Sequence, residues 1–251
     1  GVRFFDTAES YQRGHSEAQI GRFLKPRMRD HSVILSKTKA TDGDEAARDI
    51  RESLDRLRTD RIDIYLMHSV NTIPDIDRRL DRGVYDALVD AKKQGLIHHV
   101  GFSGHVTPEA NNHLIRKNLP EIEIMLCPVN VADPSYKSFI LESIPLAREH
   151  GLGILAMKSL AGGGLIGGRS VWGRLAGQDR PAIVPDLVSF DDAHRFSLSQ
   201  PVASLVAGHD SIDQLEQNIR VAREAVEMPE SQREELVRKV ADIASRGMNE
   251  H

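Results

Sequence analysis

Short apolar runs alternate with longer amphipathic stretches along the chain, and this alternation constrains the fold more than any other feature. The apolar runs are rich in Val, Ile and Leu, as is typical of strands buried on both faces. They cover residues 2–5, 32–36, 62–67, 99–102, 124–129, 153–156 and 203–207. Helical patterns cover residues 46–58, 81–94, 137–150, 211–225 and 228–244. This βα repeat predicts a parallel sheet covered by helices.

The length of the chain favours a closed barrel over an open sheet. The 251 residues match the size of a parallel (β/α)8 TIM barrel, although seven strands are too few to close one of the usual kind. An open doubly wound sheet predicts a Gly-rich phosphate turn after the first strand, and DTAESYQRGHSE contains no GxGxxG. We therefore expect a single (β/α)8 barrel domain over residues 1–251 whose first βα unit lies upstream of Gly1.

Composition and charge make several classes of protein unlikely. The net charge is −4 and no basic stripe is present, so we do not expect a nucleic-acid partner. No apolar run approaches the roughly 20 residues needed to cross a bilayer, so we expect no membrane insertion. Cys127 is the one cysteine in the sequence, which rules out a disulfide within the chain and any Cys-clustered metal site. We expect a cytoplasmic protein without a metal, with an export signal upstream of Gly1 as the alternative.

Polar residues fall at the ends of successive predicted strands. Asp6, Lys37, His68 and Ser103 end the first four, and Tyr11 lies five residues beyond Asp6. In barrels of this class the chemistry sits at the carboxyl ends of the strands. Taken singly, these residues have ordinary explanations: a turn cap, a solvated lysine, a structural histidine, a packed aromatic. Their coincidence on neighbouring strand ends predicts an active site.

The same stretches resemble the aldo-keto reductases. FFDTAESY, ILSKTK, SLDRLRTDRIDIYLMH and HHVGFS occur in the family's order and at similar spacing, and GVRFFDTA matches its second strand. The later stretches CPVNVADPSY and GLGILAMKSLAGGG resemble a bacterial branch of the family. The resemblance implies a (β/α)8 barrel, in agreement with the strand pattern.

The resemblance also implies an activity, which is reversible hydride transfer between NADPH or NADH and a small-molecule aldehyde or ketone. The catalytic residues would then be Asp6, Tyr11, Lys37 and His68. Tyr11 would supply the proton to the carbonyl oxygen. Lys37 would lower the pKa of the Tyr11 phenol, and Asp6 would pair with Lys37. His68 would orient the substrate oxygen.

The cofactor residues implied by the resemblance depart from the family pattern. Ser103 matches the serine that binds the nicotinamide carboxamide, but Gly104 stands where an asparagine is usual. Asn130 stands at the place of a glutamine and Met157 at the place of a stacking aromatic, and Lys158 would reach the pyrophosphate. The loop over 161–168, which has five glycines, would lie against the cofactor or simply be mobile.

The last part of the chain bears on the choice between NADPH and NADH. Gly208, Gln214, Gln217 and Asn218 fall on the places that usually bind the adenosine phosphate, and none of them carries a positive charge. The usual preference for NADPH is therefore in doubt. Two other functions stay open: a regulatory subunit that binds cofactor without turnover, and a barrel lyase that forms a Schiff base through Lys37 or Lys158.

Overall fold

The computed structural model describes residues 2–24, 26–169, 179–180, 182–184, 186–224 and 226–245. The chain divides into two compact units. The first unit comprises Gly1–His105, Glu109–Leu126 and His150–Leu152. The second unit comprises Val106–Pro108, Cys127–Glu149 and Gly153–His251.

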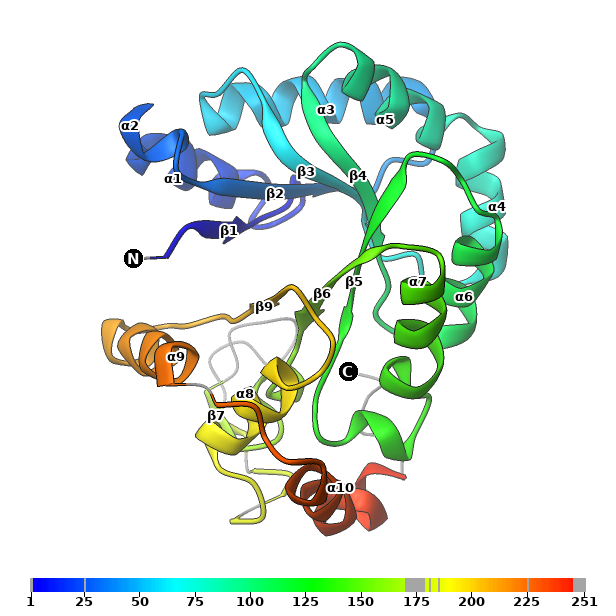
Figure 1. Ribbon diagram of the computed structural model, residues 1–251. Coiled ribbons are helices and arrows are strands. Elements are labelled where there is room, and N and C mark those ends of the chain that lie inside the picture. The colour runs from blue at the N-terminus through cyan, green and yellow to red at the C-terminus, as the bar shows by residue number, and fades with distance from the viewer. Residues whose placement is uncertain are drawn as a thin grey trace. The chain divides into compact units, whose positions relative to one another are not determined.

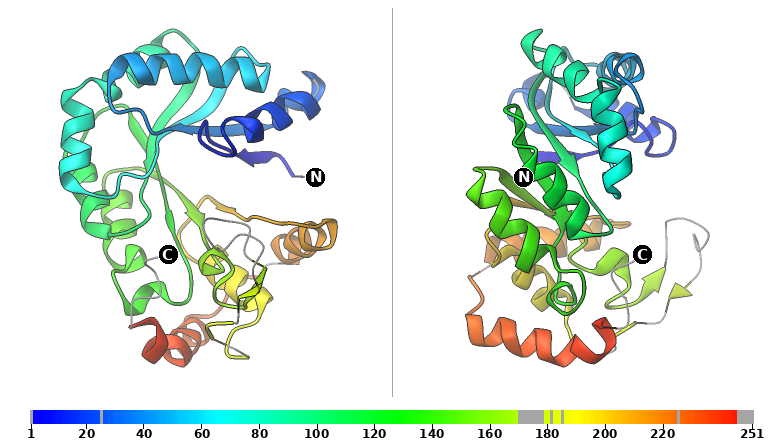
Figure 2. Two further views of the ribbon diagram at one scale, coloured as in Figure 1. Left: turned by 180° about the vertical axis from the view of Figure 1, so that it is seen from behind. Right: turned by 90° about the vertical axis from the view of Figure 1, so that its right-hand side faces the viewer.

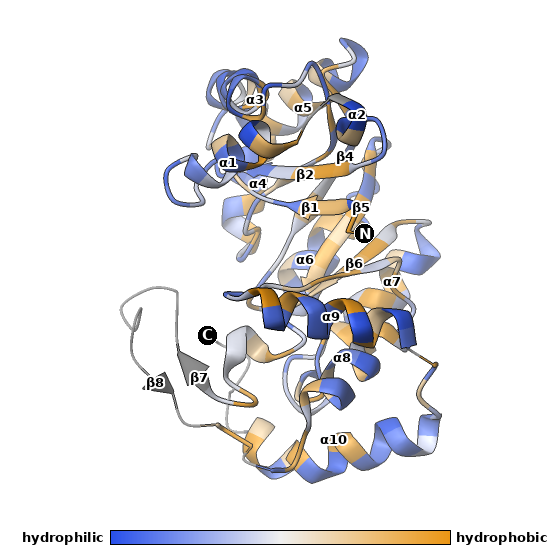
Figure 3. Cartoon of the chain, turned by 90° about the vertical axis from the view of Figure 1, so that its left-hand side faces the viewer, coloured by the Kyte–Doolittle hydropathy of each residue, from blue (hydrophilic) through white to orange (hydrophobic). Residues whose placement is uncertain are grey.

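Parallel strands form the centre of the first unit (Figure 1). In hydrogen-bonded order they are β1 (Phe4–Asp6), β2 (Val33–Thr38), β3 (Ile62–Met67), β4 (Ile97–Ser103) and β5 (Ile122–Pro128). The register pairs Asp6 with Leu35 and Lys37 with Leu66. Ile34, Leu35 and Leu66 have no exposed surface, so these strands are buried as their composition predicts. Figure 3 shows the apolar residues concentrated on the strands.

Amphipathic helices cover this sheet. They are α1 (His15–Phe23), α2 (Pro26–Arg29), α3 (Gly43–Leu57), α4 (Ile73–Asp81), α5 (Val84–Lys93) and α6 (Pro108–Arg116). Helix α3 begins where the Asp42 carboxylate accepts a hydrogen bond from the Glu45 amide, which satisfies an otherwise unpaired backbone group. Its buried residues include Ile50, Leu54 and Leu57, three apolar positions on one helical face. Figure 2 shows α3 and α5 side by side, in agreement with their close contacts.

The second unit has a parallel strand pair and a separate helical core. Strand β6 (Gly153–Met157) pairs with β9 (Ser204–Val206). A short antiparallel ladder joins β7 (Gly168–Arg169) to β8 (Asp179–Arg180). The helices are α7 (Ile144–Glu149), α8 (Phe190–Leu198), α9 (Ile212–Glu224) and α10 (Glu230–Ala244). Phe196, Met228 and Val240 belong to a buried apolar cluster beneath α8 and α10.

All seven predicted parallel strands are present, and their order β1-β2-β3-β4-β5-β6-β9 follows the chain. The helix predicted over 81–94 is present as α5, but it begins only at Val84 because Gly83, at φ 82°, separates it from α4. The helix predicted over 137–150 is only partly α-helical. The stretch 137–150 begins with a π-helical turn over Phe139–Ser143, and only Ile144–Glu149 is α-helical. The β7–β8 ladder was not predicted. No helix in the described part of the chain has the length and apolar character that crossing a membrane requires.

Candidate active site

The predicted catalytic residues lie at the carboxyl ends of three adjacent strands of the first unit. Asp6 is the last residue of β1, Lys37 is the last but one of β2, and His68 directly follows β3. The His68 backbone amide donates to the Thr38 carbonyl at 2.8 Å, which continues the β2–β3 ladder past the end of β3. Parallel strands end at one edge, so the sequence pattern brings these side chains together.

Lys37 is at the centre of the group. Its ammonium donates to Asp6 Oδ2 at 3.0 Å, to the Thr7 carbonyl at 2.6 Å and to the Tyr11 hydroxyl at 3.3 Å. Asp6 Oδ1 lies 2.9 Å from the same nitrogen. The side chain is 1% exposed, so almost all of its charge is compensated by these oxygens rather than by solvent. The arrangement fixes the ammonium beside the phenol.

The pKa of Tyr11 departs from the sequence-based expectation. Lys37 lowers this pKa as expected, but burial of the phenol is the larger effect, and the net pKa lies above its usual value of 10.0. Burial likewise raises the pKa of Asp6, and the Lys37 ammonium opposes that shift. In this state Tyr11 keeps its proton at neutral pH, as a proton donor must.

His68 is a neutral imidazole at the same edge. Burial, with a further contribution from the Lys37 charge, lowers its pKa from 6.5 to about 2. Its ring centroid lies 5.7 Å from that of Tyr11 in an edge-on arrangement at 74°. Within the described residues Nδ1 has no hydrogen-bond partner. The Arg79 guanidinium donates to the His68 carbonyl at 2.8 Å and so fixes the backbone of the loop that follows β3.

Ser103 and His105 extend the group at the end of β4. Ser103 Oγ accepts a hydrogen bond from the Ser69 amide at 3.0 Å and lies 3.5 Å from His105 Nε2. The His105 ring centroid is 5.7 Å from that of His68. Sequence reasoning missed His105 and Arg79. His105 follows the strand end in HHVGFSGH, which is the same signal that identified Ser103.

Three of the predicted cofactor residues lie at the end of β6 or close to it, in the second unit. Asn130 Nδ2 donates to the Lys158 carbonyl at 3.2 Å, and Asn130 Oδ1 accepts from the Ala132 and Asp133 amides. The Asn130 amide therefore organises this loop through backbone contacts. Met157 is 8% exposed, and burial lowers the pKa of Lys158. Lys158 has a left-handed backbone, with φ at 58°.

The remaining predicted cofactor residues lie in or before α9, also in the second unit. Gly208 lies in the loop after β9, and a Cβ built there would meet nothing within 4 Å. Gln214 Oε1 accepts from the Asp210 amide at 2.7 Å, which closes the turn that starts the helix. Gln217 belongs to the same helix, and the buried Asn218 Oδ1 lacks a partner among the described residues.

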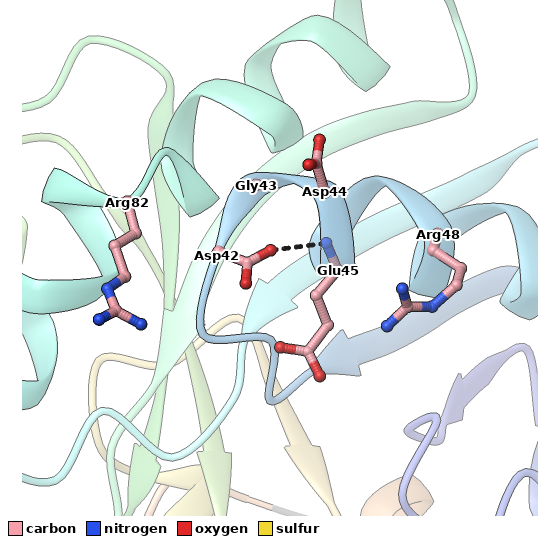
Figure 4. Close-up of a pocket in the computed structure, with 6 residues that line it drawn as sticks. All are labelled: Asp42, Gly43, Asp44, Glu45, Arg48 and Arg82. Carbon is pink, nitrogen blue, oxygen red and sulfur yellow. Dashed lines mark hydrogen bonds between the residues drawn. The ribbon is translucent and has the colours of Figure 1, made fainter.

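A separate, open pocket lies at the start of α3 and contains none of these residues (Figure 4). Its lining residues are Asp42, Gly43, Asp44, Glu45, Arg48 and Arg82. The carboxylates of Asp42 and Glu45 already accept backbone hydrogen bonds, from the Glu45 and Thr41 amides. Among the described residues no group of three His, Cys, Asp or Glu side chains could hold a metal ion.

Comparison with known proteins identifies the family. The model of the aldo/keto reductase family matches residues 1–176. The chain belongs to the aldo-keto reductase family. A Bacillus subtilis oxidoreductase, YqkF, is 28% identical over 88% of this chain and 78% of its own length. D-threo-aldose 1-dehydrogenase of a Pseudomonas species is 27% identical over 91% of this chain and 81% of its own length.

A solved structure has the same fold. An aldo-keto reductase of Klebsiella pneumoniae, solved in complex with NADPH, superposes with a TM-score of 0.73 and 21% identity over 96% of this chain and 81% of its own. The seven-stranded parallel sheet of this aldo-keto reductase therefore matches the parallel (β/α)8 barrel fold that the strand pattern predicts.

Proposed function

We propose that this protein reduces an aldehyde or a ketone with NADPH or NADH, and that Tyr11 donates the proton to the carbonyl oxygen. One observation carries the proposal: a buried Lys37 ammonium is shared between the Asp6 carboxylate and the Tyr11 hydroxyl, at 3.0 Å and 3.3 Å. Family membership supports the reaction class, because the tetrad of Asp6, Tyr11, Lys37 and His68 lies within the matched residues 1–176.

The bound cofactor supplies the hydride, and the protein supplies position and charge. Negative charge develops on the carbonyl oxygen as the hydride arrives, so that oxygen needs donors placed in advance. Tyr11 is a neutral phenol at neutral pH and donates its proton there, while Lys37 stabilises the phenolate that remains. The neutral His68 imidazole donates a hydrogen bond that orients the same oxygen.

We assign cofactor binding to the residues that the family pattern indicates. The fit is supported by the buried Asn218 Oδ1, which has no hydrogen-bond partner among the described residues. The proposed cofactor-binding residues are Ser103, Asn130, Met157, Lys158, Gly208, Gln214, Gln217 and Asn218. The proton-donating and substrate-orienting roles remain with the first unit.

The structure disfavours a Schiff-base role for Lys37. A Schiff-base lysine needs a free lone pair on its nitrogen to attack a carbonyl, whereas Lys37 Nζ donates hydrogen bonds to three oxygen acceptors. Burial lowers the pKa of Lys158, so Lys158 is the better candidate for this alternative. Borohydride trapping with a carbonyl compound, followed by mass spectrometry, should leave Lys158 unmodified if the protein is a reductase.

Tyr11→Phe tests the proposed function directly. The substitution removes one hydroxyl, so we expect the turnover number for carbonyl reduction to fall by about 10²-fold or more. The dissociation constant for NADPH should change less than about twofold, because the phenol belongs to the substrate side of the proposed reaction. Steady-state oxidation of NADPH with a panel of aldehydes, and fluorescence titration of the cofactor, measure the two quantities.

Tyr85→Phe is the matched control. The Tyr85 hydroxyl accepts a hydrogen bond from the Glu121 backbone amide at 3.2 Å, and Tyr85 lies on α5 away from the tetrad. This variant should keep wild-type turnover. Full turnover in Tyr11→Phe would show that another group donates the proton. Cofactor binding by the wild type without turnover of any carbonyl would favour the regulatory alternative.

A further inference from the structure

Helix α6 places an amide side chain where a side chain of residue 104 would begin. A Cβ built on Gly104 would lie 1.7 Å from Asn111 Oδ1, 2.6 Å from its Cγ and 2.8 Å from its Nδ2. These distances are far below van der Waals contact, so a residue with a Cβ at position 104 would displace the Asn111 amide. Gly104 is thus required for Asn111 to occupy this space.

The Asn111 amide is buried and lacks protein partners. Asn111 has no exposed surface, and neither Oδ1 nor Nδ2 has a hydrogen-bond partner among the described residues. A primary amide offers two donors and an acceptor, and leaving them unmet inside a protein costs free energy. Buried polar groups in native proteins are almost always hydrogen-bonded, so the partner of this amide is to be sought outside the described residues.

The amide lies at the same edge of the sheet as the proposed catalytic residues. Gly104 directly follows Ser103, the last residue of β4. The Ser103 carbonyl and hydroxyl accept hydrogen bonds from Val70 and Ser69, the residues next to His68. All of these residues, including Asn111, belong to the first unit. The strand end therefore presents a serine hydroxyl and an unpartnered amide close together.

We infer that Asn111 is a cofactor-positioning residue that binds the carboxamide of the nicotinamide ring. A primary carboxamide is the natural complement of an asparagine amide, because each offers both a donor and an acceptor. Ser103 is already proposed for the same carboxamide. The inference rests on the proposed function, since it needs a nicotinamide cofactor, and it adds a residue from α6 that the sequence pattern did not identify.

Asn111→Leu tests the inference with binding measurements alone. Leucine has a similar size and cannot form hydrogen bonds. We expect the dissociation constant for NADP⁺ to rise about tenfold, while that for 2′-phospho-ADP-ribose, which lacks the nicotinamide, changes less than twofold. A loss of packing alone would weaken both ligands equally. Isothermal titration calorimetry with the full chain measures both constants.

Asn112→Leu is the matched control. Asn112 is the next residue of α6, is 7% exposed and also has a buried Oδ1 without a partner among the described residues. The Asn112→Leu variant should leave the ratio of the two dissociation constants unchanged. Gly104→Ala is a second variant, needed if Asn111→Leu does not fold. Its Cβ should displace the amide and produce the same selective loss for NADP⁺.

The outcomes separate this inference from the proposed function. Equal weakening of both ligands, or of neither, by both variants would overturn the role of Asn111 while leaving the reductase proposal intact. A wild-type protein that binds neither NADP⁺ nor NAD⁺ would overturn both. A selective loss in both variants supports the inference.

Discussion

At the scale of residues, the site depends on a lysine whose charge is shared rather than paired with one acid. Lys37 contacts the Asp6 carboxylate, a backbone carbonyl and the Tyr11 hydroxyl, while its side chain is 1% exposed. Removing one partner of a buried charge leaves the other uncompensated, which costs several kcal/mol. The three contacts therefore fix where the phenol can lie as well as how readily it ionises.

The His68 imidazole should make the stability of the protein depend on pH. Its pKa is about 2 in the folded state and about 6.5 when unfolded, so only the unfolded chain binds a proton between these values. The free energy of unfolding should fall by up to about 1.4 kcal/mol for each pH unit below 6.5. Urea unfolding at pH 7, 6 and 5 measures the slope.

His68→Gln should flatten this slope, because the variant has no imidazole to protonate at this position. His31→Gln, at an exposed position in the loop before β2, is the control and should keep the wild-type slope. Identical slopes in wild type and His68→Gln would show that His68 is not held neutral by the fold.

At the scale of elements, two contacts join α1 to α3: a buried ion pair of Glu17, and the close approach of Gly21 to the backbone of α3. The Glu17 carboxylate, which has no exposed surface, accepts from the Ser36 hydroxyl at 2.5 Å and from Arg56 Nε at 2.7 Å. A Cβ built on Gly21 would lie 2.4 Å from the Arg56 carbonyl oxygen and 2.7 Å from the Leu57 carbonyl oxygen. The two contacts set the position of α1 beside the end of α3.

Gly21→Ala should destabilise the protein, although alanine favours helices. Alanine gains about 1 kcal/mol of helix propensity over glycine. The new methyl group would overlap backbone atoms of α3, which cannot move as a flexible side chain can, and overpacking costs about 1–3 kcal/mol. The contacts with backbone atoms place the cost in the upper part of this range, so we expect a net loss of about 1–2 kcal/mol in urea unfolding without cofactor.

Gly208→Ala is the control for this substitution. No atom lies within 4 Å of its added Cβ and its φ is not positive, so stability should change by less than about 0.5 kcal/mol. A Gly21→Ala variant as stable as the wild type would show that α1 can shift away from α3.

Sequence periodicity predicted the strands and helices in which buried apolar residues recur at regular spacing. It missed features that depend on the conformation or contacts of a single residue. Strand β3 was predicted residue for residue because five of its six residues are apolar and buried. The break at Gly83 depends on one left-handed residue inside an otherwise helical pattern. Asp6, Lys37 and His68 were found because parallel strands align their ends. Asn111 was missed because its proximity to Gly104 arises from the packing of α6 against the end of β4, which the sequence pattern does not show.

At the scale of the whole molecule, the proposed catalytic residues and most proposed cofactor residues are on different compact units. Asp6, Tyr11, Lys37 and His68 lie in the first unit, and only Ser103 and Asn111 join them there as proposed cofactor residues. The proposed residues for the adenosine phosphate lie in the second unit. Preference between NADPH and NADH should therefore depend on charges in α9 and the loop before it.

We expect NADH to bind within about tenfold of NADPH, a difference below roughly 1.4 kcal/mol. Discrimination for a 2′-phosphate usually requires paired cations, and Gly208 and Gln214 are uncharged. Arg220 already contacts Asp191 at 2.9 Å and Glu224 at 3.2 Å. Parallel dissociation constants at pH 8 test the expectation. A preference for NADPH above a hundredfold would mean that another cation binds the phosphate.

The four proposed catalytic residues fall within residues 6–68, one uninterrupted stretch of the chain. Such a stretch can be inherited as a single block, and recombination downstream of it would leave these four residues together. Loops after β5 can then diverge, lengthen or be exchanged between related genes without any change to the proposed proton donor, Tyr11, and its partners. A lineage with this arrangement can explore new substrates and cofactors while its reaction chemistry stays constant.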